Sequence, residues 1–179
     1  MRLALPTLLF LTTVFDIPAA QAQQTSLPSS SCSEPQQKQF DFWVGDWDLT
    51  WPAEGQMKAG HGANSINRTL DRCVVEEHFS GGDSVSLRGM SVSTYDARSG
   101  KWKQTWVDNE GNYLDFVGEF KDGQMVLARE ATRPDGAKIQ QRMVWKNINA
   151  KELDWSWERS EDGGKTWQVV WSIHYKRKV

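Results

Sequence analysis

Short runs of alternating apolar and polar residues occupy the chain from Trp47 to its C-terminus, and no stretch shows a sustained helical period. Such a period of two is typical of β-strands that bury one face. Turn signals such as Asp122-Gly123 separate the runs at steps of about ten residues. The pattern predicts about ten strands, near residues 46–52, 58–68, 72–79, 84–95, 101–108, 112–120, 124–130, 138–145, 151–159 and 166–176.

The short connections between these runs predict an all-β fold, an antiparallel meander in which each strand pairs with the next along the chain. An open sheet of this size would leave two long unpaired edges. We therefore expect closure into a ten-stranded barrel in preference to a Greek-key sandwich. Residues 36–44 are expected to form a short helical turn before the first strand.

The N-terminus reads as a secretory signal peptide over residues 1–22. Arg2 precedes an apolar run from Leu3 to Phe15, and the small-residue pattern of a cleavage site follows at Ala20-Gln21-Ala22. The run is shorter than the roughly 20 residues that a membrane-spanning helix needs. A polar leader over residues 23–39 and a barrel domain over residues 40–179 complete the expected organisation. We expect a periplasmic or secreted protein without a membrane span.

Two cysteines and a nearly balanced charge limit the chemistry further. In an oxidising compartment, Cys32 and Cys73 are expected to form one disulfide, which would tie the leader to the barrel. A zinc site or a nucleophilic cysteine is disfavoured, because neither residue has a close His or second Cys partner. The net charge is -2, and the only basic cluster is Lys176-Arg177-Lys178. This balance argues against a nucleic-acid partner.

Tryptophan makes up 10 of the 20 aromatic residues, and the strand alternation places much of it on inward faces. An amide and a carboxylate share one of those faces with two indoles, which is unusual for a simple core. One interpretation is a cavity for an apolar or aromatic ligand with a polar end. The alternative is a core network in which indole N–H groups donate to Gln104 and Asp108. The predicted ligand-binding set is Trp102, Gln104, Trp106, Asp108, Arg142, Trp155, Trp157 and Trp171.

The segment FDFWVGDWD over residues 40–48 contains Gly45-x-Trp47, and Arg177 stands at the end of the last predicted strand. This combination resembles the signature of calycins, the lipocalins and their relatives. That resemblance implies that Trp47 closes one end of a barrel with Arg177 packed across its ring. Together with GKWKQTWVDNEG and SEDGGKTW, the pattern resembles a family of secreted bacterial calycin-like proteins without an agreed function. It brings no catalytic residues with it.

Residues 160–167 match the SxDxGxTW pattern of the Asp-box in sialidases and related propellers. In those proteins the motif recurs once per blade, whereas here it occurs once, and a single copy cannot build a propeller. We therefore expect it to stabilise one hairpin, with Asp162 binding turn amides and Trp167 packing nearby.

Histidines and acids provide weaker hypotheses. Glu76 and His78 share a strand face and could approach His61 in a metal site, but their spacing is not diagnostic, and an outer face or barrel rim is the preferred interpretation. Nitrobindins, ten-stranded calycin relatives, bind haem through a histidine near the chain end. His174 is the candidate here, yet it alternates with the inward Ile173 and should point outward. We predict no metal and no cofactor.

The combined prediction is an exported barrel that binds a small apolar or aromatic molecule. The alternatives are a calycin-fold enzyme of the isomerase, cyclase or hydrolase type that does acid–base chemistry in the same cavity, or a barrel that binds haem or another protein. Fold alone does not decide among them. A strongly perturbed Asp108 or Glu76 facing an open cavity would favour the enzyme.

Overall fold

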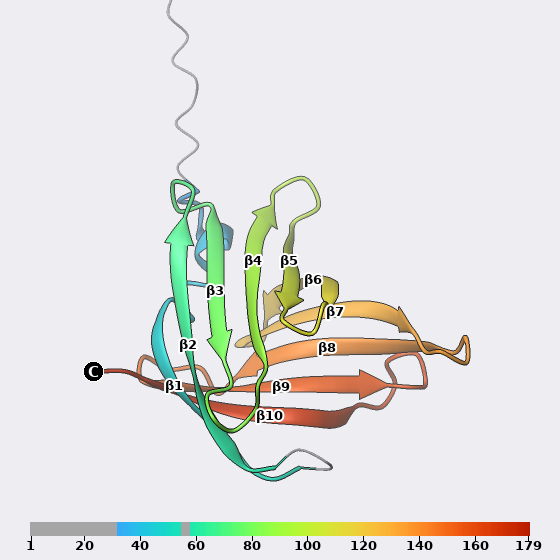
Figure 1. The fold of residues 1–179 in the computed structure, drawn as a ribbon. Coiled ribbons are helices and arrows are strands. Elements are labelled where there is room, and N and C mark those ends of the chain that lie inside the picture. Colours follow the sequence, from blue (N-terminus) through green and yellow to red (C-terminus); the bar gives the residue numbers. More distant parts are fainter. Residues whose placement is uncertain (1–31, 55–57) are drawn as a thin grey trace, which may run out of the picture. The chain divides into compact units, whose positions relative to one another are not determined.

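Each strand of the fold pairs with its neighbours along the chain, and the first pairs with the last. A computed structural model describes residues 32–54 and 58–179. In these residues it contains one 3-10 helix, η1 (Pro35–Lys38), and ten strands (Figure 1). The strands are β1 (Gly45–Trp51), β2 (Gly60–Thr69), β3 (Val74–Ser80), β4 (Arg88–Asp96), β5 (Lys101–Asp108), β6 (Tyr113–Lys121), β7 (Gln124–Thr132), β8 (Lys138–Lys146), β9 (Glu152–Ser160) and β10 (Gln168–Arg177).

This closed antiparallel meander confirms the predicted fold class. The expected strands are all present, and the largest shift is at β4, which begins at Arg88 instead of residue 84. The residues before it form a turn in which the N–H groups of Ser84 and Val85 donate to the carbonyl of Gly81. The predicted helical turn is shorter than expected, since η1 ends at Lys38 and turns follow it. The predicted signal peptide and the leader up to residue 31 lie outside the described residues.

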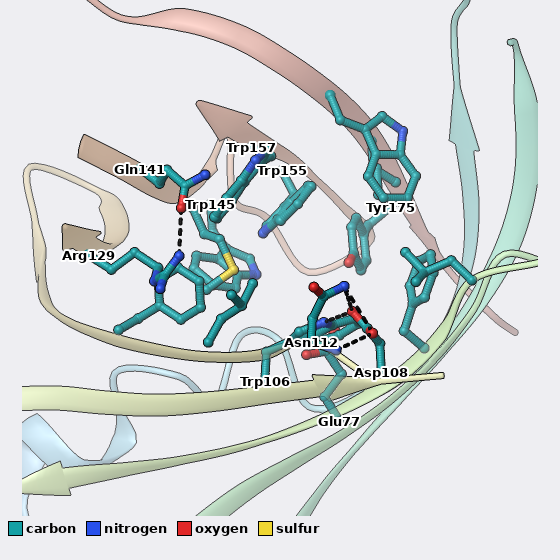
Figure 2. A pocket seen from close by; sticks show the side chains of 17 residues that line it. Glu77, Trp106, Asp108, Asn112, Arg129, Gln141, Trp145, Trp155, Trp157 and Tyr175 are labelled. Carbon is teal, nitrogen blue, oxygen red and sulfur yellow. Dashed lines mark hydrogen bonds between the residues drawn. The ribbon is translucent and has the colours of Figure 1, made fainter. Parts of the chain in front are cut away.

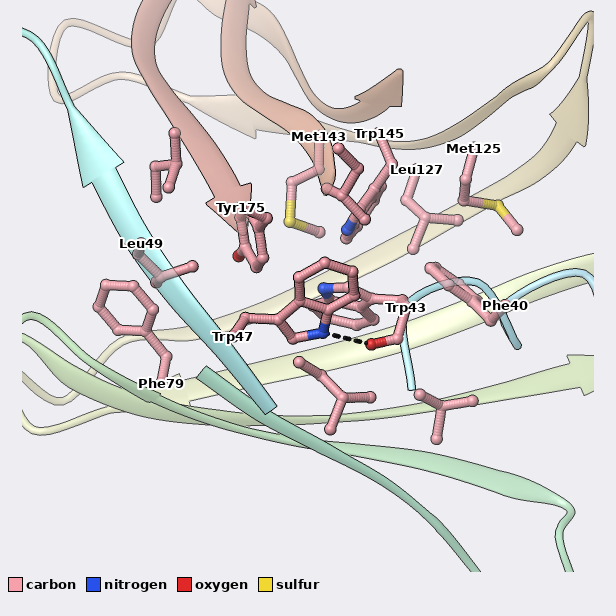
Figure 3. Close-up of a cluster of buried hydrophobic side chains, with 14 of the residues drawn as sticks. Phe40, Trp43, Trp47, Leu49, Phe79, Met125, Leu127, Met143, Trp145 and Tyr175 are labelled. Carbon is pink, nitrogen blue, oxygen red and sulfur yellow. Dashed lines mark hydrogen bonds between the residues drawn. The ribbon is translucent and has the colours of Figure 1, made fainter. Parts of the chain in front are cut away.

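One end of the barrel is filled by packed aromatic rings. Phe40 and Trp43, which follow η1, meet Trp145 of β8 at centroid distances of 5.3 and 5.2 Å (Figure 3). Phe40 also meets Trp102 edge-on at 4.9 Å. Such edge-to-face pairs are favourable beyond the apolar area that they bury. The residues after η1 therefore plug this end of the barrel.

Arg177 completes the closed end, in the position that the calycin resemblance implied for it. Its Cζ lies 4.1 Å from the ring centroid of the buried Trp47, whose Nε1 donates to the carbonyl of Trp43 (Figure 3). The guanidinium also donates to the carbonyls of Phe42, Val44 and Ala150. Gly45 has a φ of 133°, and a Cβ there would overlap Nη1 of Arg177. Glycine is needed at this position both for its backbone conformation and for this close approach.

The predicted disulfide between Cys32 and Cys73 is present. It joins the segment before η1 to the turn between β2 and β3. Polar contacts reinforce this link, because the Arg68 guanidinium pairs with Asp41 at 2.7 Å and donates to the carbonyl of Gln37. The described residues include no helix long and apolar enough to cross a membrane.

The hairpin between β9 and β10 is organised by Asp162. Its carboxylate accepts hydrogen bonds from the backbone N–H groups of Lys165 and Thr166 and from the Thr166 hydroxyl. The hydrogen bonds from Thr166 and Ser160 lower the pKa of Asp162 to about 2. Trp167 donates to the carbonyl of Gly164. The motif thus holds a turn together.

Candidate functional site

A cavity of about 330 Å³ opens among the inward faces of the strands (Figure 2). This volume is at the lower end of the range for small-molecule sites. Aromatic side chains form much of the wall, namely Phe79, Trp106, Phe116, Trp145, Trp155, Trp157, Trp171 and Tyr175. The barrel is therefore filled at the Trp47 end and contains this cavity farther along its interior.

The structure brings five of the predicted ligand-binding residues to this cavity. Trp106 and Asp108 reach it from β5, Trp155 and Trp157 from β9, and Trp171 from β10. Edge-to-face packing links the walls, because Phe79 lies 6.1 Å from Trp106 and 5.9 Å from Trp171 between ring centroids. The rings therefore support one another across the cavity.

Three other predicted residues do not line the cavity. Trp102 is buried at the closed end, where its Nε1 donates to Gln39 Oε1 at 3.1 Å. Gln104 is buried and donates to Ser93 Oγ. Arg142 lies on the even-numbered face of β8, which points outward. It pairs with Glu158 at 2.6 Å, and its Cζ lies 3.9 Å from the Trp167 ring centroid. These three side chains serve packing and the outer surface.

Asp108 anchors the turn at the cavity rim. Its carboxylate accepts hydrogen bonds from Trp106 Nε1 at 2.9 Å and from Asn112 Nδ2, as well as from the backbone N–H groups of Glu110 and Asn112 (Figure 2). Desolvation opposes ionisation, but these hydrogen bonds outweigh it and lower the pKa of Asp108. Asp108 is therefore an ionised carboxylate whose acceptor positions are already used.

Glu77 places a second carboxyl in the cavity, and the sequence reasoning missed it. Burial raises the pKa of Glu77, although hydrogen bonds from Ser91 Oγ at 2.6 Å and Asn64 Nδ2 at 2.7 Å oppose that rise. The same Asn64 Nδ2 donates to the Tyr175 hydroxyl at 3.2 Å. The alternation of Val75, Glu77 and Phe79 on β3 was the signal that identifies Glu77 as inward.

Arg129 of β7 was also missed. It lines the cavity, and its Nη1 donates to Gln141 Oε1 at 2.7 Å (Figure 2). The signal was again alternation, because Met125 and Leu127 share its face and are fully buried. A charged residue at the end of an apolar face is easily read as the exposed end of a strand.

The histidines lie away from the cavity. His78 pairs with Glu76 at 2.7 Å on an exposed face, and His61 is exposed. His174 is exposed and contacts Asp154 at 2.8 Å, consistent with the outward orientation expected for it. Across residues 32–54 and 58–179, no three acidic, His or Cys side chains group closely enough to hold a metal ion.

No protein-family model matches this chain, and the search of curated proteins finds no significant match. The sequence resemblances noted above therefore have no independent support from these comparisons. The ten-stranded antiparallel meander barrel itself is consistent with a calycin-like fold.

Proposed function

We propose that this protein binds a small apolar or aromatic molecule in the barrel cavity. The observation that carries the proposal is the cavity of about 330 Å³ with indole and phenyl walls. Burying apolar ligand surface against such walls is favourable by about 25 cal/mol per Å² before the costs of association. The disulfide supports placing this activity outside the cytoplasm, in the periplasm or the medium.

The arrangement of the rings supports binding over mere packing. Trp171 meets Trp51 at 5.3 Å and Trp155 at 6.0 Å, both edge-on, so its ring is held from two sides. A wall held in this way needs little reorganisation when a ligand enters, and the ordering cost of binding falls. A barrel that only needed a core would gain stability by closing the remaining space.

The test is a titration of the protein with fatty acids, aromatic acids, isoprenoids and haem, followed by intrinsic tryptophan fluorescence. Trp106→Ala removes a cavity wall, and Asp108→Asn alters the rim beside it. Trp167→Ala is the matched control, since this indole packs on Arg142 instead of lining the cavity.

Saturable quenching by one class of compound, weakened in Trp106→Ala and retained in Trp167→Ala, is the expected result. Absence of a response to every compound in the panel would contradict the proposal. Equal weakening in both tryptophan variants would also contradict it, because the effect would then not come from the cavity.

A second candidate function is acid–base catalysis, and the observation favouring it is Glu77. Burial raises the pKa of the Glu77 carboxyl, and a carboxylate whose pKa is raised is a stronger base than an ordinary one. The hydrogen bonds from Asn64 and Ser91 fix its orientation. In this reading Glu77 would remove a proton from a bound ligand and return one elsewhere, as an isomerase does.

The catalytic candidate is tested by deuterium exchange. A ligand found in the titration is incubated in D2O with the wild type and with Glu77→Gln, and its C–H signals are followed by NMR. Exchange or conversion in the wild type, lost in a Glu77→Gln variant that still binds, supports catalysis. An unchanged ligand in the wild type leaves binding as the function.

A further inference from the structure

Arg129 is the one cation among the described residues that line the cavity, and it has no carboxylate partner there. Its guanidinium donates through Nη1 to the neutral amide of Gln141 and lies 5.9 Å from the Phe116 ring centroid. Its Nε is buried and has no acceptor within residues 32–54 and 58–179. An arginine keeps its charge at any physiological pH, so the protein leaves a positive charge at the cavity wall without a counter-ion.

Other partly buried arginines of the barrel have a carboxylate partner or several carbonyl acceptors. Arg68 meets Asp41 at 2.7 Å, and Arg142 meets Glu158 at 2.6 Å. Arg177 instead satisfies three backbone carbonyls. Because removing a charge from water is costly unless it is paired, Arg129 is the exception that needs a reason.

The carboxyls of the cavity do not serve as its partner. Figure 2 shows Arg129 and Gln141 on one side of the cavity, away from Asp108 and Glu77. Asp108 is already saturated by the donors of its own turn. Burial raises the pKa of Glu77, which favours its neutral form. The charge of Arg129 therefore remains available to a ligand.

Two indole N–H groups of residues that line the cavity also lack an acceptor among the described residues. The Nε1 atoms of Trp145 and Trp171 are buried and have no hydrogen-bond acceptor in the described part of the chain. Both indoles line the cavity. These two N–H groups are shielded from a ligand, so the Arg129 cation is what makes the wall complementary to an anion.

We propose that the cavity selects small aromatic or apolar molecules that carry one carboxylate, and that Arg129 binds that carboxylate. The inference rests on the proposed binding function and names its ligand class. With Nη1 donating to Gln141 and Nε buried, Nη2 is the guanidinium donor that remains for a carboxylate oxygen. The apolar body of the ligand then lies among Trp106, Trp155 and Trp171.

The test uses three probes with one naphthalene frame: 2-naphthoate, 2-naphthylmethanol and 2-naphthylmethylamine. Isothermal titration calorimetry measures their affinities for the wild type, Arg129→Gln and Arg129→Lys. Arg98→Gln removes the same charge in the exposed turn between β4 and β5, outside the cavity lining, and is the matched control. Thermal unfolding of each variant verifies that it is folded.

We expect the carboxylate to bind the wild type about 10- to 100-fold more tightly than the alcohol, as charge-assisted hydrogen bonds allow, and the amine to bind most weakly. Arg129→Gln should abolish the preference while leaving the alcohol affinity nearly unchanged, Arg129→Lys should retain part of it, and Arg98→Gln should retain all of it. Equal binding of acid and alcohol to the wild type, or equal loss of both in Arg129→Gln, would overturn the carboxylate inference alone. Failure of all three probes to bind would overturn it together with the proposed function.

Discussion

Removal of the Arg177 guanidinium should destabilise the barrel by opening its closed end. In Arg177→Ala the carbonyls of Phe42, Val44 and Ala150 lose donors at 3.0, 2.7 and 2.9 Å, and the Trp47 ring loses its cover at 4.1 Å. Each hydrogen bond contributes about 1 kcal/mol net and the stacking about 0.5–1 kcal/mol. Water can reach part of this site, so we expect a total loss of about 2–3 kcal/mol.

The truncation of Trp47 should cost more. This side chain is fully buried, and removal of such an indole typically costs about 3–5 kcal/mol. The two residues touch, so their effects should not add. Arg177→Ala should cost less in a Trp47→Ala background than in the wild type, by about 1 kcal/mol.

Urea unfolding followed by circular dichroism measures these differences. Arg177→Lys keeps the charge but not the planar fork, and we expect it to recover only part of the loss. Lys176→Ala is the control, because this neighbour is exposed and lies on the opposite face of β10 from Tyr175; its effect should stay within about 0.5 kcal/mol. A loss in Arg177→Ala no larger than that of Lys176→Ala, or strictly additive losses in the double variant, would refute the reasoning.

Three further predictions concern stability. Burial raises the pKa of Glu77, so protonation of its carboxyl stabilises the folded state; this contribution is fully present below about pH 4.5 and is lost as pH rises through the folded-state pKa. The melting temperature of Glu77→Gln, relative to wild type, should therefore increase between about pH 4 and pH 8, and a pH-independent difference would contradict this prediction. Reduction of Cys32–Cys73 opens a link across 41 positions and should cost about 4 kcal/mol while far-UV circular dichroism keeps its β-sheet signal; an unchanged urea midpoint after complete reduction would argue against the constraint. A Cβ on Gly89 would overlap the Trp106 ring, so Gly89→Ala should cost about 1–3 kcal/mol in urea unfolding and alter ligand affinity, whereas wild-type behaviour in both assays would show that the ring moves freely.

The strands and their order were predictable because they depend on local signals. Alternation identifies a strand face, and Gly and Asp mark where the chain turns. The disulfide followed from the presence of two cysteines in a chain read as exported. The packing of Arg177 on Trp47 came from the calycin resemblance, and the structure contains it.

The position of a side chain along the barrel axis was not predictable from strand alternation and turn residues. Trp102 and Trp106 share a face of β5, but four residues of strand span about 13 Å. Trp102 consequently lies in the closed end, whereas Trp106 reaches the cavity. Strand tilt and register decide this division, and both depend on pairings between residues far apart in the sequence.

Arg142 was predicted to line the cavity but lies outside it, for a different reason. In β8 the consecutive residues Met143, Val144 and Trp145 are all apolar and buried, so alternation does not reveal which face is inward. Arg142 shares the outward face with the buried Val144, and its Cζ lies 3.9 Å from the ring centroid of Trp167 in the β9–β10 hairpin. The sequence interpretation did not place Glu77 in the cavity, because it considered only its neighbours Glu76 and His78, as ligands of a metal site.

The central claim is that the hollow part of the barrel takes up a small molecule, and native mass spectrometry tests it most directly. Wild type, Leu114→Trp and Val117→Trp are incubated with the ligand panel. Leu114 lines the cavity, so its replacement by Trp fills the space, whereas Val117 faces outward on the same strand and is 48% exposed. We predict a one-to-one adduct with the wild type and Val117→Trp that is lost in Leu114→Trp. An adduct that persists in the folded Leu114→Trp variant, or wild-type protein that remains free of adduct with every compound, would contradict the account.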